Sequence, residues 1–183
     1  MPNNILLNFT ELHEAQVAEL NNKLPLKTCE SYKPADDEHG HHVRVKSPAV
    51  LIEISEMSPG DNRGDGRMAF ECEMVYHCIL STKTENVELQ IRNFAAAIAQ
   101  TIKNNKFGLG GSVTNPEDIR LYPGLFKSGD KGFESWVVTA KQTVYLGEDN
   151  QEPDFLPANA LFSFAPDIGL GHEADYQGAI PAQ

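Results

Sequence analysis

The strict alternation of residues 68–80 constrains the fold of this chain more than any other feature. Seven apolar side chains occupy every even position: Met68, Phe70, Cys72, Met74, Tyr76, Cys78 and Leu80. Because successive side chains of a strand point to opposite faces of a sheet, this pattern predicts a long strand with one face in the core. The odd positions combine polar residues such as Glu71 and Glu73 with apolar Val75 and Ile79. We therefore expect the second face to meet solvent along one half and to be partly covered along the other.

Directly after this strand the apolar period changes to the spacing of a helix. The positions that recur every three or four residues are Val87, Ile91, Phe94, Ala95, Ile98 and Ile102. This pattern predicts a long amphipathic helix that packs on the sheet. The expected N-terminal cap is Thr82 together with Glu85, or Thr84, because these side chains can accept from free backbone N–H groups.

Weaker patterns place further elements before the long strand. Residues 10–22 have a loose apolar face that is typical of a helix, with Thr10 at its start. Residues 43–54 fit two short strands, or one strand interrupted at Pro48. Residues 58–66 concentrate glycine, proline, asparagine and aspartate, so the chain is expected to reverse there.

The second half of the domain repeats the pattern of strands. Residues 119–122 fit a short strand, and residues 133–146 alternate again before Gly147. The order of helix, strands, central helix and strands predicts an α+β fold. We expect an antiparallel or mixed β-sheet packed by one long central helix and a shorter N-terminal helix.

The composition of the chain changes after residue 147. Residues 1–147 are predicted to form a single α+β domain, and residues 148–183 an irregular C-terminal arm that contains prolines and glycines. This arm is nevertheless apolar at Phe155, Leu156, Leu161, Phe162, Phe164, Ile168 and Leu170. A segment of this kind needs a surface to cover, so we expect it to dock against its own domain or against a neighbouring subunit.

The charge and hydropathy of the chain exclude two classes of partner. Fifteen Lys and Arg residues against 26 Asp and Glu residues give a formal net charge of −11, which would repel a phosphate backbone. Sequence-specific nucleic-acid binding is therefore not expected. No apolar run approaches the length of a membrane span, and the first residues lack the basic region of a signal peptide. The sequence predicts a soluble protein of the cytoplasm without a membrane partner.

The densest polar cluster is the best candidate for a metal site. It consists of Asp36, Asp37, Glu38, His39, His41 and His42. Imidazoles and carboxylates are the ligands that zinc, nickel or copper favour. However, these residues are consecutive, whereas a structural site usually gathers ligands from separate elements. We interpret the cluster as a solvated polar loop and assign no metal ligand.

The other candidates also favour a structural interpretation. Cys29, Cys72 and Cys78 are odd in number and lack a CxxC spacing, which predicts reduced and mostly buried thiols. Cys72, His77 and Cys78 lie on one strand, where residues five and six apart are separated by about 16 to 20 Å, so they cannot share a metal.

Two short motifs and one histidine complete the candidates. Residues 108–112 are rich in glycine but follow a helix instead of opening one, so they indicate a turn and not a phosphate-binding loop. The tripeptide at residues 63–65 is interpreted as part of a turn, because its residue types favour turns, and His172 is interpreted as a residue of the arm. We assign no catalytic residue and no cofactor, and expect the protein not to be an enzyme.

Several segments carry a family resemblance. They are residues 48–54, the Asp-Gly-Arg of residues 65–67, the helix segment 91–102, the pair Ser135-Trp136 and residues 144–148. Over about residues 48–147 the chain resembles the tail terminator and tail-completion proteins of long-tailed bacteriophages, in particular the terminator-like proteins of Mu-like prophages. The resemblance implies a structural subunit that is made in the bacterial host cytoplasm and ends in the virion tail.

The same resemblance implies the partners of the protein. Such proteins assemble as a ring, commonly a hexamer, on the end of the tail tube, where they stop its growth and offer a surface to the head connector. The expected partners are therefore further copies of the chain, tail-tube proteins and head-connector proteins. Two alternatives remain open: another tail or baseplate component, and, from a different class, a small metal-dependent enzyme that uses the histidine-rich loop.

Overall fold

The computed structural model describes residues 5–32, 45–124, 132–148, 161–162 and 177–178. The chain separates into two compact units, Met1–Asn150 and Gln151–Gln183. The first unit contains a mixed five-stranded sheet and two α-helices, which confirms the predicted α+β class. In the second unit, β6 (Leu161–Phe162) pairs with β7 (Gln177–Gly178) in antiparallel orientation.

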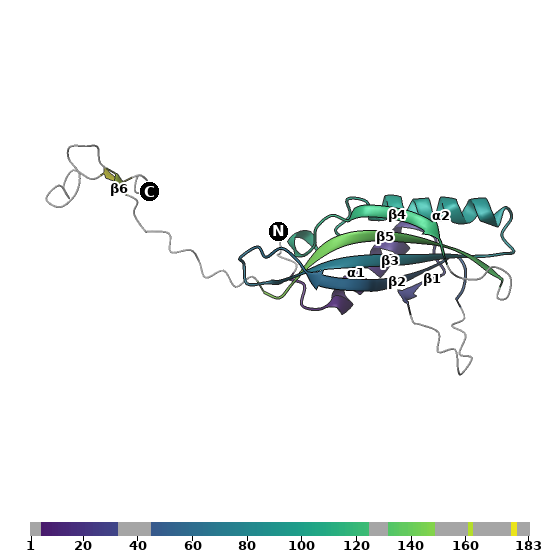
Figure 1. Ribbon diagram of the computed structural model, residues 1–183, viewed down its shortest axis with the longest axis horizontal. Helices are drawn as coiled ribbons and strands as arrows, with labels where there is room; N and C mark the ends of the chain where they lie inside the picture. The colour runs from purple at the N-terminus through teal and green to yellow at the C-terminus, as the bar shows by residue number, and fades with distance from the viewer. Residues whose placement is uncertain (1–4, 33–44, 125–131, 149–160, 163–176, 179–183) are drawn as a thin grey trace, which may run out of the picture. The chain divides into compact units, whose positions relative to one another are not determined.

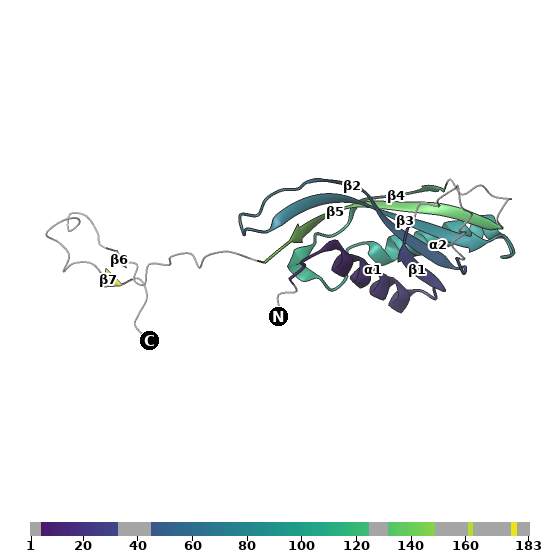
Figure 2. The same ribbon diagram turned by 90° about the horizontal axis from the view of Figure 1, so that it is seen from below.

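The large sheet has the strand order β1-β2-β3-β5-β4. Its strands are β1 (Thr28–Ser31), β2 (Ala49–Pro59), β3 (Met68–Ser81), β4 (Glu117–Pro123) and β5 (Phe133–Leu146). β1 runs parallel to β2, and every other neighbouring pair is antiparallel. The helices α1 (Phe9–Lys23) and α2 (Val87–Ile102) both lie on one face of this sheet, as Figures 1 and 2 show. We call the opposite face the second face.

The alternation of β3 builds the core as predicted. Met74, Tyr76 and Cys78 are fully buried between the sheet and the helices. Met68 is the exception, because it opens the strand at the end of the β3–β5 ladder and remains 64% exposed. From α2 the fully buried residues are Ile91, Ala95, Ile98 and Ile102, so the helical period also predicted the packed face correctly.

The bounds of β2 differ from the prediction. It is one strand that begins at Ala49, after Pro48, and continues to Pro59. Its last residues pair with the first part of β3, for example Pro59 with Phe70, and the register shifts between Ile54 and Glu56. The long partner strand therefore extends β2 into a segment whose composition indicated a turn.

The first helix begins at Phe9, one residue before the predicted start, but its capping residue differs from the prediction. Asn8, not Thr10, caps α1: its side chain accepts a hydrogen bond from the backbone N–H of Glu11 at 3.1 Å. The Glu11 carboxylate accepts in return from the N–H of Leu7 at 2.9 Å. The asparagine therefore satisfies one of the free N–H groups of the first turn.

The cap of α2 is also at a different residue. α2 begins after Asn86, which has a left-handed backbone (φ 51°) and makes no capping side-chain bond. Thr82, Thr84 and Glu85 lie in the turn that precedes it. Asparagine tolerates this conformation better than most residues, and this allows the turn to end there.

One buried hydrogen bond joins α1 to β3 inside the core. Gln16 Nε2 donates to Tyr76 Oη at 3.1 Å, and both residues are almost completely buried. Burial also raises the pKa of the Tyr76 hydroxyl well above its usual range. The hydroxyl is thus kept neutral and serves as a structural partner of the amide.

We expect the Tyr76→Phe variant to lose about 1 to 3 kcal/mol of unfolding free energy, because the Gln16 amide would remain buried without an acceptor. Urea denaturation of both proteins measures the difference. The double variant Gln16→Leu/Tyr76→Phe removes both polar groups and should recover part of the loss. Equal stability of Tyr76→Phe and wild type would contradict the structural role of this bond.

Candidate functional site

The second face of the sheet is divided into an apolar half and an acidic half. In the apolar half, Ala49, Leu51 and Ile79 are buried beneath Tyr32, Val45 and Phe133. This confirms the expected partial cover, and it explains why the odd position Ile79 of β3 is apolar. His77 lies at the boundary: its Nε2 is 2.9 Å from Glu53 Oε2, and its ring stacks on Tyr32 with the centroids 4.5 Å apart.

The acidic half is built by residues from four strands. At one level of the sheet the strand register aligns Glu56 of β2, Glu73 of β3, Lys141 of β5 and Glu117 of β4. Glu71 lies one row further along β3, opposite Thr143. Lys141 Nζ is 3.6 Å from Glu71 Oε1, and both side chains are about half exposed. Such an exposed pair contributes little, roughly 0 to 1 kcal/mol.

Two hollows open beside Lys141. The larger one, of about 320 Å³, is lined by Glu71, Thr114, Glu117, Asp118, Lys141, Gln142 and Thr143. The smaller one, of about 130 Å³, is lined among others by Glu73, Asp118 and Arg120. The Arg120 guanidinium binds the Asp118 carboxylate through two hydrogen bonds of 2.9 and 2.8 Å. The hollows lie where β4 shifts its register against β5 between Glu117 and Arg120.

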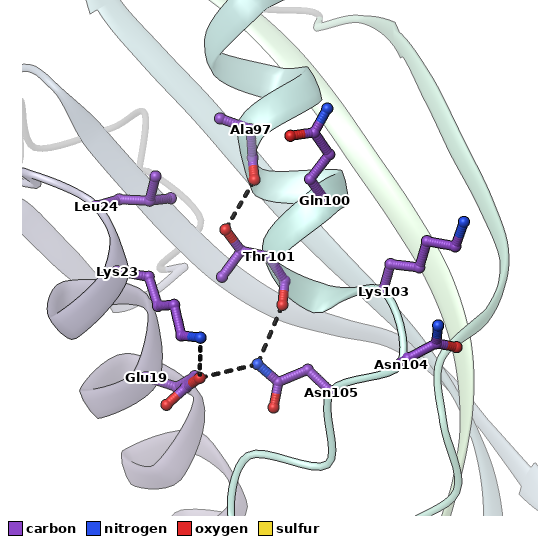
Figure 3. Close-up of a pocket in the computed structure, with 9 residues that line it drawn as sticks. All are labelled: Glu19, Lys23, Leu24, Ala97, Gln100, Thr101, Lys103, Asn104 and Asn105. Carbon is purple, nitrogen blue, oxygen red and sulfur yellow. Dashed lines mark hydrogen bonds and ion pairs between the residues drawn. The ribbon is translucent and has the colours of Figure 1, made fainter.

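A third hollow, of about 500 Å³, lies between the helices and is polar (Figure 3). Asn105 Nδ2 donates to Glu19 Oε1 and to the Thr101 carbonyl, both at 3.0 Å. Lys23 Nζ is 3.6 Å from the same Glu19 oxygen. Because these groups bind one another, they connect α1 to the turn after α2, and we interpret this hollow as a structural contact.

The tripeptide of residues 63–65 is part of a tightly bonded turn, as its composition indicated. Arg63 donates to the Gly111 carbonyl at 3.0 Å and stacks on Tyr145, 3.7 Å from the ring centre. The Asp65 carboxylate accepts from the backbone N–H of Arg67 at 3.1 Å and from its Nε at 2.9 Å. These bonds from Arg67 hold the pKa of Asp65 below its ordinary value of 3.8.

The lowered pKa of Asp65 gives a pH dependence of stability with a definite sign. Because the unfolded chain binds the proton more readily, Asp65 stabilises the fold fully above about pH 3.8, and this contribution is lost as the pH falls through the folded pKa. We therefore expect Asp65→Asn to melt below wild type at neutral pH and the gap to narrow on acidification. Thermal melts of wild type and Asp65→Asn, from neutral pH down to the folded pKa of Asp65, measure this difference in melting temperature. A gap that is independent of pH would contradict the ion pair.

The three thiols behave as predicted for buried cysteines. Cys72 and Cys78 are buried on the helix side of β3, whereas His77 lies on the second face, so the three do not converge. Burial raises the pKa of Cys72 to about 11 and that of Cys78 to about 12. Cys29 is partly buried, and its pKa is raised to about 11 by burial and by the charge of Glu30. Protonated thiols are poor nucleophiles and metal ligands.

Several candidates from the sequence lie outside the described residues. These are the cluster of Asp36, Asp37, Glu38, His39, His41 and His42, and His172 of the arm. Within the described ranges, no group of three or more His, Cys, Asp or Glu side chains is arranged to hold a metal ion. Residues 110–112 form a single 3₁₀ turn, as their position after a helix indicated. No helix in the described part is long and apolar enough to cross a membrane.

The acidic half of the second face was not predicted from the sequence. Its members are separated by up to half the chain, and only the register of four strands aligns them. The available signal was weak: Glu71 and Glu73 occupy odd positions of a strand whose even positions are apolar.

No model of a known protein family matches the chain, and no curated protein matches it in sequence.

Proposed function

We propose that the protein is a structural subunit of a long-tailed bacteriophage or prophage, namely a tail terminator or tail-completion protein. In this role it assembles with further copies as a ring on the end of the tail tube and joins the tail to the head connector. It is made in the cytoplasm of the bacterial host and becomes part of the virion tail. The resemblance of residues 48–147 to this class of protein is the starting point of the proposal.

The observation that carries the proposal is the exposed edge strand β4. Among the described strands β4 pairs only with β5, so its other edge presents backbone N–H and C=O groups. Leu121 and Tyr122 on this strand are exposed, Tyr122 by 44%. An edge of this kind is a ready surface for a neighbouring chain, and a head-to-tail contact repeated around an axis closes a ring.

The charge of the chain supports the same role. A net charge of −11 disfavours the capture of DNA that passes through a tail. The apolar side chains of the C-terminal arm offer a second surface for a neighbour. A subunit of this kind works through its surfaces, and its assembly is the activity to test.

The test is to delete the coding sequence from the phage or prophage genome and to examine the particles by electron microscopy. We expect tail tubes of irregular length that carry no heads, with normal virions restored by the wild-type gene in trans. Tails of normal length joined to heads would overturn the proposal. A complete lack of tubes would instead favour a baseplate component.

Point variants connect this phenotype to the edge strand. The Tyr122→Arg variant replaces an exposed aromatic side chain of β4 with a charged one. We expect this variant not to restore normal virions when it is supplied in trans. Leu89→Arg is the matched control, because Leu89 is similarly exposed, by 56%, but lies on α2. Normal virions with Tyr122→Arg would show that β4 does not mediate assembly.

A further inference from the structure

Exposed apolar side chains gather at the end of the large sheet where β3 begins and β5 ends. Four large apolar residues of the described ranges belong to this end, and each is at least half exposed: Ile5, Leu7, Met57 and Met68. We call these four residues the apolar patch. Apolar residues that are exposed singly are ordinary, whereas a group of them at one place indicates an interaction surface.

Strand pairing and one backbone bond bring the N-terminal segment to the start of β3. Met68 lies opposite Leu146 of β5, and the next residue, Gly147, donates its backbone N–H to the Leu6 carbonyl at 3.0 Å. Leu6 is fully buried in the core, whereas the residues on either side of it are exposed. The exposed parts of this segment therefore lie beside the end of the β3–β5 ladder.

The apolar surface continues from β3 to the edge of β2. Met57 lies opposite Cys72, which is buried on the helix side of the sheet. Residues an even number of positions apart on a strand share a face, so Met57 and Met68 face the same side. Between them, exposed Pro59 lies opposite Phe70, which is only partly buried. The patch is therefore one continuous surface.

The chain leaves the domain at this patch and continues as the C-terminal arm. The first residue of the arm, Glu148, directly follows the residue that is bonded to Leu6. Phe155 and Leu170 lie 7 and 22 residues beyond it, which at about 3.3 Å per residue allows a reach of about 23 to 73 Å. A small domain has a diameter of about 30 Å. The apolar residues of the arm can therefore reach a neighbouring copy.

The charge of the arm disfavours packing of one arm on another. Residues 149–183 contain six acidic residues and no Lys or Arg: Asp149, Glu152, Asp154, Asp167, Glu173 and Asp175. Two arms in contact would bring like charges together. The apolar side chains of the arm are better covered by an uncharged surface of a domain, and the four residues of the apolar patch provide one.

We propose that the apolar patch of one copy is the docking site for the C-terminal arm of a second copy. The apolar residues of the arm cover Met57 and Met68 and remove them from water. Because the arm and the patch are different surfaces, the contact is head-to-tail, and its repetition around an axis closes a ring. This inference rests on the proposed function, since it takes further copies of the chain as partners, and it names the two surfaces that meet.

Two double variants of the full-length chain each remove one side of the contact. Met57→Ser/Met68→Ser changes the patch, and Phe155→Ser/Leu156→Ser changes the arm. In sedimentation, each is expected to associate with itself about tenfold more weakly than wild type. The patch variant should melt close to wild type, because both methionines are exposed. Leu89→Ser is the control for an exposed apolar residue on α2 and should associate like wild type.

An equal mixture of the two double variants distinguishes the arm of a second copy from the arm of the same chain. The patch variant keeps an intact arm, and the arm variant keeps an intact patch, so one contact can form between them. We expect the mixture to associate more strongly than either variant alone at the same total concentration.

Three outcomes would overturn the proposal. A mixture that associates no more than its components would mean that the arm does not bind the patch of another copy. Loss of association in only one double variant would mean that its surface binds something other than the second surface. A wild-type chain that stays monomeric at every concentration would show that the two surfaces do not hold copies together.

The role in a tail is decided separately by the gene deletion. Headless tails of irregular length, combined with a mixture that does not associate, would leave the proposed function standing and overturn only the contact between arm and patch. Normal virions after the deletion, combined with a mixture that associates, would overturn the role in a tail and support the contact.

Discussion

The Ile98→Ala variant is expected to lose about 2 to 5 kcal/mol of unfolding free energy. Ile98 is fully buried on the face of α2 that packs against the sheet. Removing its side chain beyond the β-carbon forfeits the burial of the lost methyl groups and leaves a cavity that the rigid sheet cannot close. The higher helix propensity of alanine offsets only about 0.4 kcal/mol of this loss.

Urea denaturation followed by circular dichroism measures the effect of Ile98→Ala. Leu89→Ala on the same helix is the matched control, because Leu89 is exposed and its removal should change stability by less than about 0.5 kcal/mol. Phe94→Ala is expected to fall between the two, since its side chain is only partly buried. Equal midpoints for Ile98→Ala and Leu89→Ala would mean that α2 does not pack on the sheet through this face.

A chain that ends at Glu148 is expected to remain folded but to lose self-association. The elements of the first unit, from α1 to β5, all precede this residue, and the unit has its own core. The truncation also keeps the hydrogen bond from the Gly147 N–H to the Leu6 carbonyl at 3.0 Å. The deleted residues include the apolar side chains of the arm, which we propose to cover a surface of a neighbouring subunit.

Sedimentation and circular dichroism of the full-length and truncated chains test this expectation together. A folded species of lower mass than the full-length assembly would support an arm between subunits. The full-length variant Phe155→Ser/Leu156→Ser is the control, because it weakens the apolar surface without shortening the chain and should also reduce association. Global unfolding of the truncated chain would refute an arm between subunits, because it would mean that the arm completes the core of its own domain.

Long periodic segments are the part of this structure that the sequence by itself determined. The alternation of residues 68–80 predicted β3 to within one residue, and residues 133–146 predicted β5 with the observed bounds. The helical period identified the residues of α2 that pack in the core. In each segment the same face is buried over many residues, so apolar side chains recur with the period of the strand or helix. The type of element can therefore be predicted from the segment alone, without knowledge of the residues that it contacts.

Features that depend on distant residues were decided only by the tertiary structure. β2 continues through Ser58 and Pro59 because β3 offers them partners. Gln16 is buried because Tyr76, distant in sequence, supplies an acceptor. The acidic half of the second face exists only because the strand register sets Glu56, Glu73, Lys141 and Glu117 side by side. Strand register and strand order are set by the free energy of the whole sheet, which no single segment of the sequence contains.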